Sequence, residues 1–170
     1  MIDPPRVELW AILPVLILIG GALLALLGSA FARRGDQAPF VLFTMAVLAA
    51  ASGAALWLWD REPATVLEGM ASVDRLGVAG TLVLCATGAF GAYLGYHYFE
   101  RDELRRNEFY ALLLFALGGM ALLVVAADLI VVFLSLEIFS LGLYILSGLN
   151  RNDRRSSEAA MKYFLLGAFS

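Results

Sequence analysis

The sequence has few of the residues that usually carry metal or redox chemistry. Its 170 residues include one cysteine, one histidine and one lysine. The single cysteine, Cys85, excludes an internal disulfide, and there is neither a CxxC motif nor a His/Cys cluster for a metal. A glycine-rich phosphate loop and a basic patch are also missing, so we expect no nucleic-acid partner.

Charge is scarce as well. Only 16% of the residues are charged and 61% are hydrophobic, with a mean hydropathy of +0.82, whereas a soluble domain is about a quarter charged and about half apolar. The apolar residues form long blocks, and the charges cluster between them. We therefore predict an all-α fold, a polytopic bundle of transmembrane helices in a lipid bilayer, with residues 1–170 as a single membrane domain.

Five blocks reach the length of about 20 residues that a membrane-spanning helix needs. A sixth block begins near residue 157 and stops at residue 170, so we expect five complete helices, the start of a sixth, and a longer parent protein. The first block is too long, and its start too acidic, for a cleaved signal peptide. Pro14 inside it predicts a mild kink. The expected helices cover residues 9–31, 39–59, 76–99, 109–127, 129–149 and 157–170.

The arginines predict the orientation of the bundle. Eight of the eleven arginines fall in the segments after the first, third and fifth expected helices. Because cytoplasmic loops carry an excess of arginine and lysine, we place these segments in the cytoplasm and the N-terminus outside. Aromatic side chains then mark both interfaces. Trp10, Trp57 and Trp59 fall at the outer one, and Tyr96, Tyr98, Phe109 and Tyr110 at the inner one.

Two details concern helix ends and packing. The fourth and fifth blocks form one apolar run that would be about 60 Å long as a single helix, twice the hydrocarbon thickness. Asp128 interrupts this run and is expected to be the N-cap of the fifth helix.

Gly91 and Gly95 form a GxxxG pattern in the third helix, which predicts close contact with a neighbouring helix.

One acid lies inside an apolar block. Glu137 is about 12 Å along the fifth helix from Leu129, too deep for its side chain to reach the surface. An ionised carboxylate at such a depth costs at least about 2.5 kcal/mol. The group is therefore either protonated or paired with a cation. Acids at such positions mark proton pathways, so Glu137 is the candidate proton acceptor and donor; the alternative is a static contact between helices.

Other polar residues accompany this acid. Ser140, Tyr144 and Ser147 follow Glu137 by three, seven and ten positions, so on a helix the four residues form one polar stripe. The stripe suits a short water chain toward the cytoplasm; the alternative is that these side chains only hydrogen-bond neighbouring helices. Lys162 lies about 8 Å into the sixth helix. It is either a further member of the proton path or a lysine whose ammonium group reaches the interface.

Four motifs in residues 106–170 carry a family resemblance. They are EFYALLLF from Glu108, Asp-Leu at 128–129, LEIFSLGLY from Leu136 and SSEAAMKYFLLGA from Ser156. This segment resembles subunit N of the proton-pumping NADH-quinone oxidoreductase, respiratory complex I. The last motif favours subunit N over the paralogous subunits M and L and over multisubunit sodium/proton antiporters. The first two expected helices resemble the family only in being apolar helices and not through a specific motif.

The resemblance implies a mechanism and a setting. It assigns the essential protonatable group to Glu137 and the lysine of the sixth helix to Lys162; a partner lysine on a seventh helix would lie beyond Ser170. It implies two inverted five-helix repeats in the whole protein. The subunit would translocate protons across the bacterial inner membrane, coupled to electron transfer from NADH to quinone.

The resemblance also implies where the cofactors lie. NADH, FMN, the iron–sulfur clusters and quinone would be bound by partner subunits, and no cofactor or metal by this chain. Its partners would be the other membrane subunits of the complex. Two other functions stay open: a subunit of a multisubunit cation/proton antiporter, and a structural membrane protein in which Glu137 is a static contact.

Overall fold

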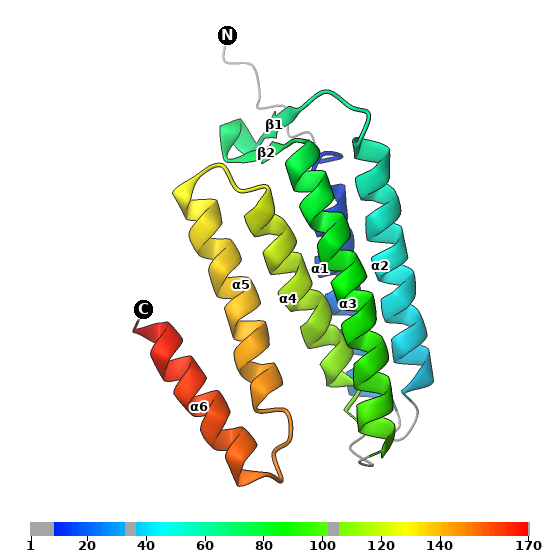
Figure 1. Ribbon diagram of the computed structural model, residues 1–170, viewed down its shortest axis with the longest axis vertical. Helices are drawn as coiled ribbons and strands as arrows, with labels where there is room; N and C mark the ends of the chain where they lie inside the picture. The colour runs from blue at the N-terminus through cyan, green and yellow to red at the C-terminus, as the bar shows by residue number, and fades with distance from the viewer. Residues whose placement is uncertain (1–8, 33–36, 102–105, 170) are drawn as a thin grey trace.

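Six helices run alternately in opposite directions through the part of the chain that the computed structural model describes, residues 9–32, 37–101 and 106–169 (Figure 1). The helical fold that the composition predicts is therefore confirmed. The helices are α1 (Leu13–Phe31), α2 (Ala38–Leu58), α3 (Arg75–Arg101), α4 (Glu108–Val124), α5 (Leu129–Ser147) and α6 (Arg154–Ala168).

Within these described ranges, α1, α2, α3 and α5 are long and apolar enough to cross a membrane. The α4 helix is also apolar but has only 17 residues. It ends at Val124, three residues before the predicted end, because the chain that follows bonds to a different element. The Ser72 amide donates to the Val125 carbonyl at 2.8 Å, and the Ala127 amide donates to the Met70 carbonyl at 2.9 Å.

That other element is a short β-hairpin between α2 and α3. Strands β1 (Ala64–Val66) and β2 (Ala71–Val73) pair antiparallel, and η1 (Leu67–Gly69) connects them. The turn places Glu68 at φ 57° and Gly69 at φ 92°, in the left-handed region that favours glycine. The hairpin is a departure from the all-α prediction. A strand of three residues is too short to produce a recognisable alternation in the sequence.

The α1 helix begins later than predicted. Residues 9–12 form turns, and Leu13 is the first helical residue, so Pro14 lies in the first turn. Proline fits there without distortion, since the first amides of a helix have no intrahelical partner in any case. The kink expected at Pro14 is therefore not found.

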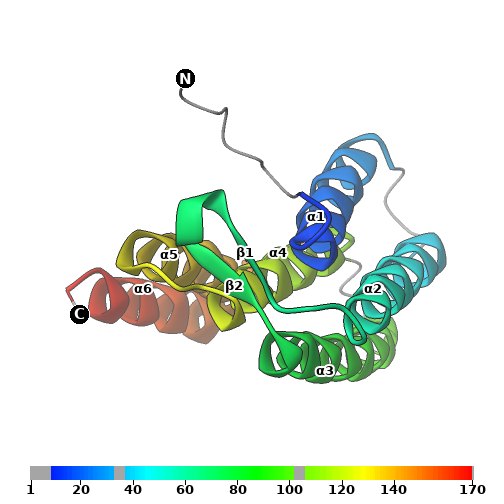
Figure 2. The ribbon, with the colours of Figure 1, turned by 90° about the horizontal axis from the view of Figure 1, so that it is seen from above.

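The α4 helix lies at the centre of the bundle. Viewed from above, α1, α2 and α3 surround it on one side, and α5 and α6 extend from it in a row on the other (Figure 2). Eight of its residues are buried, including Tyr110, Leu114 and Leu117. Side chains of α1, α2, α3 and α4 make up the main apolar core. The shortest of the apolar helices is thus the one that joins the others.

Glycines on α3 allow α4 to approach closely. At four positions, a side chain from α4 or from the residue after it occupies the space that a Cβ would need. Gly95 of the GxxxG pattern is one of them, but Gly91 has only an ordinary contact, with Leu113 at 3.9 Å. The pairs are Gly77 with Val125, Gly80 with Val124, Gly88 with Leu117, and Gly95 with Phe109.

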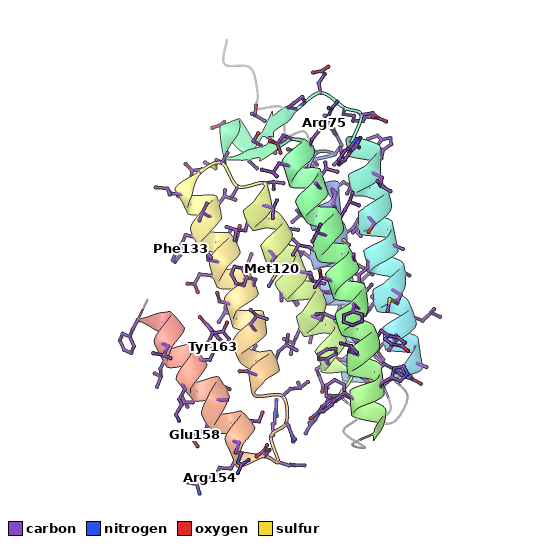
Figure 3. All side chains as sticks on the ribbon, in the orientation of Figure 1. Arg75, Met120, Phe133, Arg154, Glu158 and Tyr163 are labelled. Atoms are coloured by element: carbon purple, nitrogen blue, oxygen red, sulfur yellow. The ribbon has the colours of Figure 1, made fainter. Side chains whose placement is uncertain are left out.

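The two ends of the bundle differ in charge. Arg154 lies at one end, here called the arginine-rich end, and the hairpin lies at the other, the hairpin end (Figure 3). The positions of Arg106 before α4, Arg151 between α5 and α6, and Arg155 in the first turn of α6 place them at the arginine-rich end too. At the hairpin end the Arg61 guanidinium stacks 3.6 Å from the Trp57 ring and 5.1 Å from that of Trp10. Tyr110, expected at the membrane interface, is instead fully buried within the bundle.

Candidate functional site

The candidate acid is carried by α5, and the start of this helix is well defined. The Asp128 carboxylate accepts a hydrogen bond of 2.8 Å from the Ile130 amide and so caps the helix. The cap predicted at Asp128 is therefore confirmed. It satisfies one of the free amides of the first turn and separates α5 from α4.

The rotation of α5 is set by its contact with α4. Val131, Ser135 and Gly142 are its buried residues, and a Cβ on Gly142 would lie 3.3 Å from that of Ala116 on α4. Glu137 is two positions from Ser135, which on a helix places it on the opposite side. The α4 contact therefore turns Glu137 away from the centre of the bundle.

Glu137 has an exposed side chain in the middle of an apolar helix. It lies eight residues after the first residue of α5, about 12 Å along the helix axis. In the described part of the chain, no side chain or backbone group forms a hydrogen bond or ion pair with its carboxylate. The acid is thus held by its helix alone and is open to a group that approaches from outside this bundle.

Nearer the arginine-rich end, the same side of α5 packs against α6. The Tyr144 ring lies edge-to-face against Tyr163, with centroids 4.7 Å apart, and its hydroxyl lies against Gly167. A Cβ on Gly148 would lie 2.8 Å from that of Ala160. Because Tyr144 follows Glu137 by seven positions, both lie on one side of α5. Glu137 is therefore about two turns above the place where α6 is anchored.

The serines of the predicted stripe bond to their own helix. The Ser140 hydroxyl donates to the Leu136 carbonyl, and the Ser147 hydroxyl donates to the Tyr144 carbonyl at 2.7 Å. Such bonds leave the lone pairs of the hydroxyl oxygens available as acceptors. Glu137, Ser140, Tyr144 and Ser147 do share one side of α5, as the spacing predicts, with Tyr144 partly covered by α6.

Lys162 forms an ion pair with a residue of its own helix and not with Glu137. Its Nζ lies 2.6 Å from Glu158 Oε1, one turn earlier on α6, and both side chains are largely exposed. On α6 the contacts with α5 include those of Ala160, Tyr163, Phe164 and Gly167, which share the side of the helix roughly opposite Lys162. Lys162 therefore lies on the side of α6 that faces away from α5. The structure does not bring Lys162 and Glu137 together.

Sequence reasoning missed three residues that shape this region. Glu158 pairs with Lys162, and their spacing of four positions is the signal that would have found it. The Ser156 hydroxyl donates to the Ser147 carbonyl at 2.8 Å, which ties the start of α6 to the end of α5. Gly167 leaves room for the Tyr144 hydroxyl. Neither Ser156 nor Gly167 has a spacing that predicts its contact.

The chemistry available at this site is proton transfer. Among the residues described, no group of three His, Cys, Asp or Glu side chains lies close enough to bind a metal. A single carboxyl on an apolar helix can accept and release a proton, and its charge is favoured or disfavoured by the groups that approach it.

Comparisons with known proteins agree on one family. Residues 126–170 match the family described as NADH:quinone oxidoreductase/Mrp antiporter, TM. NADH-quinone oxidoreductase subunit N of Beutenbergia cavernae is 38% identical, over 98% of this chain and 38% of its own length. Subunit N 1 of Sorangium cellulosum is 39% identical, over 94% of this chain and 34% of its own. The similarity thus extends well beyond residues 106–170.

A solved structure has the same arrangement of helices. A chain in respiratory complex I from Thermus thermophilus with bound aureothin superimposes with a TM-score of 0.72 and 28% sequence identity. The match covers 92% of this chain and 33% of that chain. The chain spans about a third of the length of the curated relatives it matches.

Proposed function

We propose that this chain, which is similar to subunit N of NADH-quinone oxidoreductases over nearly its whole length, belongs to that family and forms part of a proton-translocating membrane subunit. Proton movement would be coupled to electron transfer from NADH to quinone in the rest of the enzyme. The observation that carries the proposal is the position of Glu137, an exposed acid in the middle of an apolar helix. Its carboxylate forms no hydrogen bond or ion pair with the described residues.

We propose that all of α1–α5 cross the membrane and that α6 is the start of a sixth spanning helix, within a single membrane domain. The arginine-rich end would face the cytoplasm and the hairpin end the outside, so that the N-terminus is outside. The separation of Arg106, Arg151, Arg154 and Arg155 from the hairpin supports this orientation. The membrane would be the bacterial inner membrane.

In the proposed mechanism Glu137 takes up and releases protons. A carboxyl in an apolar surrounding favours its protonated form, and a cation that approaches favours the ionised form. A cationic side chain that moves toward and away from Glu137 would therefore load and empty it. The position of the acid on the open side of α5, opposite the α4 contact, supports a partner from outside the described bundle.

The polar stripe and Lys162 would assist this transfer. Ser140, Tyr144 and Ser147 would support a short water chain from the arginine-rich end toward Glu137. Lys162 would belong to the path without direct contact with Glu137, because it lies on the far side of α6, where it pairs with the exposed Glu158. Glu158 itself would have no part in the transfer.

The remaining chemistry would belong to partner subunits. We propose that NADH, FMN, the iron–sulfur clusters and quinone are bound elsewhere in the complex and that this chain holds no cofactor. Its own partners would be the lipid bilayer and the neighbouring membrane subunits. The role of the described residues is to hold one titratable group in an apolar setting.

The test is the Glu137→Gln substitution in the complete subunit, within the assembled complex in lipid vesicles. Glutamine keeps the size of the side chain but cannot release a proton, so we expect proton pumping per NADH oxidised to be lost. Glu158→Gln, the same change on an exposed acid of α6, is the matched control and should leave pumping above half of its normal rate. A Glu137→Gln complex that assembles in normal amounts and pumps normally would refute the proposal.

A spectroscopic measurement tests the same site without relying on the pumping rate of a variant. Infrared difference spectra of the carboxyl stretch, with Glu137→Gln as the reference, should show a group that titrates and that shifts when NADH is added. A carboxyl locked in one state across the pH range would instead support the structural function, in which Glu137 is a static contact.

A second function has one observation in its favour. The family matched by residues 126–170 includes Mrp antiporters as well as NADH:quinone oxidoreductases. An antiporter subunit would exchange a cation for protons without NADH. Sodium-dependent proton movement in vesicles that contain the complete protein and no NADH would support the antiporter, and proton movement that requires NADH would support the respiratory enzyme.

A further inference from the structure

Three polar side chains are buried at the arginine-rich end of the bundle, away from α5 and α6. Gln37 immediately precedes α2, Asn107 immediately precedes α4, and Tyr110 lies in the first turn of α4. Their exposed fractions are 6%, 7% and 0%. Polar groups buried this completely require hydrogen-bond partners, because they have lost their contact with bulk water.

The contacts of these side chains bring them together. The Tyr110 hydroxyl lies 3.5 Å from Gln37 Oε1, so the starts of α2 and α4 meet at this point. Asn107 precedes Tyr110 by three positions and so lies on the same side of α4. Gln37 and Tyr110 are thus in contact, and Asn107 lies one turn before Tyr110. These three buried residues are here called the polar cluster.

Two atoms of this cluster have no hydrogen-bond partner in the described part of the chain. They are Nε2 of Gln37, a donor, and Oδ1 of Asn107, an acceptor. Neither side chain caps its own helix, although each stands at an N-cap position. The 3.5 Å separation between Tyr110 and Gln37 is also at the outer limit for a hydrogen bond, a distance at which a bridging water is to be considered.

The chemistry of these two atoms selects the ligand. A bound cation would meet the N–H groups of Gln37, and a bound anion would meet the carbonyl oxygen of Asn107, so both are disfavoured. The ligand must accept one hydrogen bond and donate another, and it must be small enough for a site closed to solvent. Water has these properties and is the usual partner of buried polar groups that lack one.

We propose that the α1–α4 bundle holds a structural water molecule at this cluster, which accepts from Gln37 Nε2 and donates to Asn107 Oδ1. The water joins the N-termini of α2 and α4, which no side-chain bond between Gln37 and Asn107 connects. The site shares no residue with the Glu137 stripe. The proposal therefore holds whether or not the chain translocates protons, and its failure would leave the proposed function untouched.

The direct test is a structure of the assembled complex at a resolution that shows ordered waters elsewhere in the same bundle. We expect one peak within hydrogen-bond distance of both Gln37 Nε2 and Asn107 Oδ1. Three results would overturn the proposal: no peak, a direct bond between the two amides, or a peak surrounded only by oxygen atoms at the short distances of a metal ion. This measurement needs no variant.

A double-mutant cycle tests the same water through stability. Gln37→Leu and Asn107→Leu should each lower the thermal unfolding midpoint of the subunit in the complex, because each leaves the water and the other amide without a partner. The double variant should lower it by clearly less than the sum of the two. The control pair is Gln37→Leu with Asn150→Leu, since Asn150 Oδ1 is also buried without a partner but lies between α5 and α6.

The two pairs of variants distinguish a shared water molecule from independent effects of the two amides. A control pair that is additive, with a Gln37–Asn107 pair that is not, supports a shared ligand. Additive effects in both pairs would contradict it, because two amides that hold one water are coupled. Together with the water peak, a coupled pair also excludes a direct amide–amide bond as the source of the coupling.

Discussion

The backbone nitrogen of Phe139 lies so close to Gly119 that a Cβ on this glycine would come within 2.7 Å of it. The contact joins α4 to α5 at the depth of the candidate acid. A backbone atom cannot move aside as the end of a flexible side chain can. Because Phe139 faces α4, Glu137, two positions earlier, faces the opposite side. A glycine on one helix thus determines where the acid on the next helix points.

The first prediction concerns this contact. Gly119→Val should destabilise the subunit by about 1–3 kcal/mol, the usual effect of extra atoms in a filled core. The same change at Gly53, also within a helix but with nothing within 4 Å of its Cβ position, is the control. Thermal unfolding of the complex in detergent measures both. Equal shifts for the two variants would mean that the α4–α5 contact is not as close as described.

The second prediction concerns the start of α5. Asp128→Ala removes the acceptor of the Ile130 amide and should cost about 1 kcal/mol, whereas Asp128→Asn keeps an acceptor and should cost less. Hydrogen exchange of the first-turn amides of α5 should become roughly fivefold faster in the alanine variant, as expected for a loss of this size. The first turn of α6, capped by Asp153, is an internal reference. Unchanged exchange in α5 would show that the cap contributes nothing.

The third prediction separates the ring of Tyr144 from its hydroxyl. Tyr144→Phe keeps the edge-to-face contacts with Tyr163 and Phe164, so stability should change by less than about 0.5 kcal/mol. Tyr144→Ala removes the contacts and should cost at least about 1 kcal/mol. Proton pumping in vesicles is measured on both. If the hydroxyl belongs to the water chain, the phenylalanine variant pumps more slowly at normal stability; a normal rate would exclude the hydroxyl from the path.

The fourth prediction concerns Lys162 and Glu158. Their 2.6 Å ion pair is largely exposed, and such pairs four positions apart contribute only about 0.3–0.5 kcal/mol. Lys162→Met and Glu158→Gln should therefore both leave the unfolding midpoint nearly unchanged. If the lysine is part of the proton path, only Lys162→Met should reduce pumping strongly. Equal pumping in the two variants would assign Lys162 a surface role.

Much of the helical architecture follows directly from the sequence. A long apolar block must satisfy its backbone groups internally, and a helix does so within one segment. The cap at Asp128 was equally predictable, because the residue type and the place of the break pointed to the same position. The hairpin was not predictable. It depends on pairing with Val125 and Ala127, which lie more than fifty residues away from it in the chain.

The candidate site, too, was predictable from the sequence only in part. Local spacing was enough to gather Glu137, Ser140, Tyr144 and Ser147 on one side of a helix. The same rule, applied to α6, would have paired Lys162 with Glu158. Spacing could not predict that Tyr110 is buried, since that depends on the neighbours of α4, and an aromatic residue near a helix end is equally typical of a membrane interface.

The sequence by itself determined that this chain is a helical membrane protein with one acid deep in an apolar helix, because these properties follow from composition and from a period of 3.6 residues. Only the tertiary structure decided which way the acid faces and which polar groups are buried. Those outcomes depend on close contacts between helices, such as the one at Gly119, which are set by the shape of side chains distant in sequence.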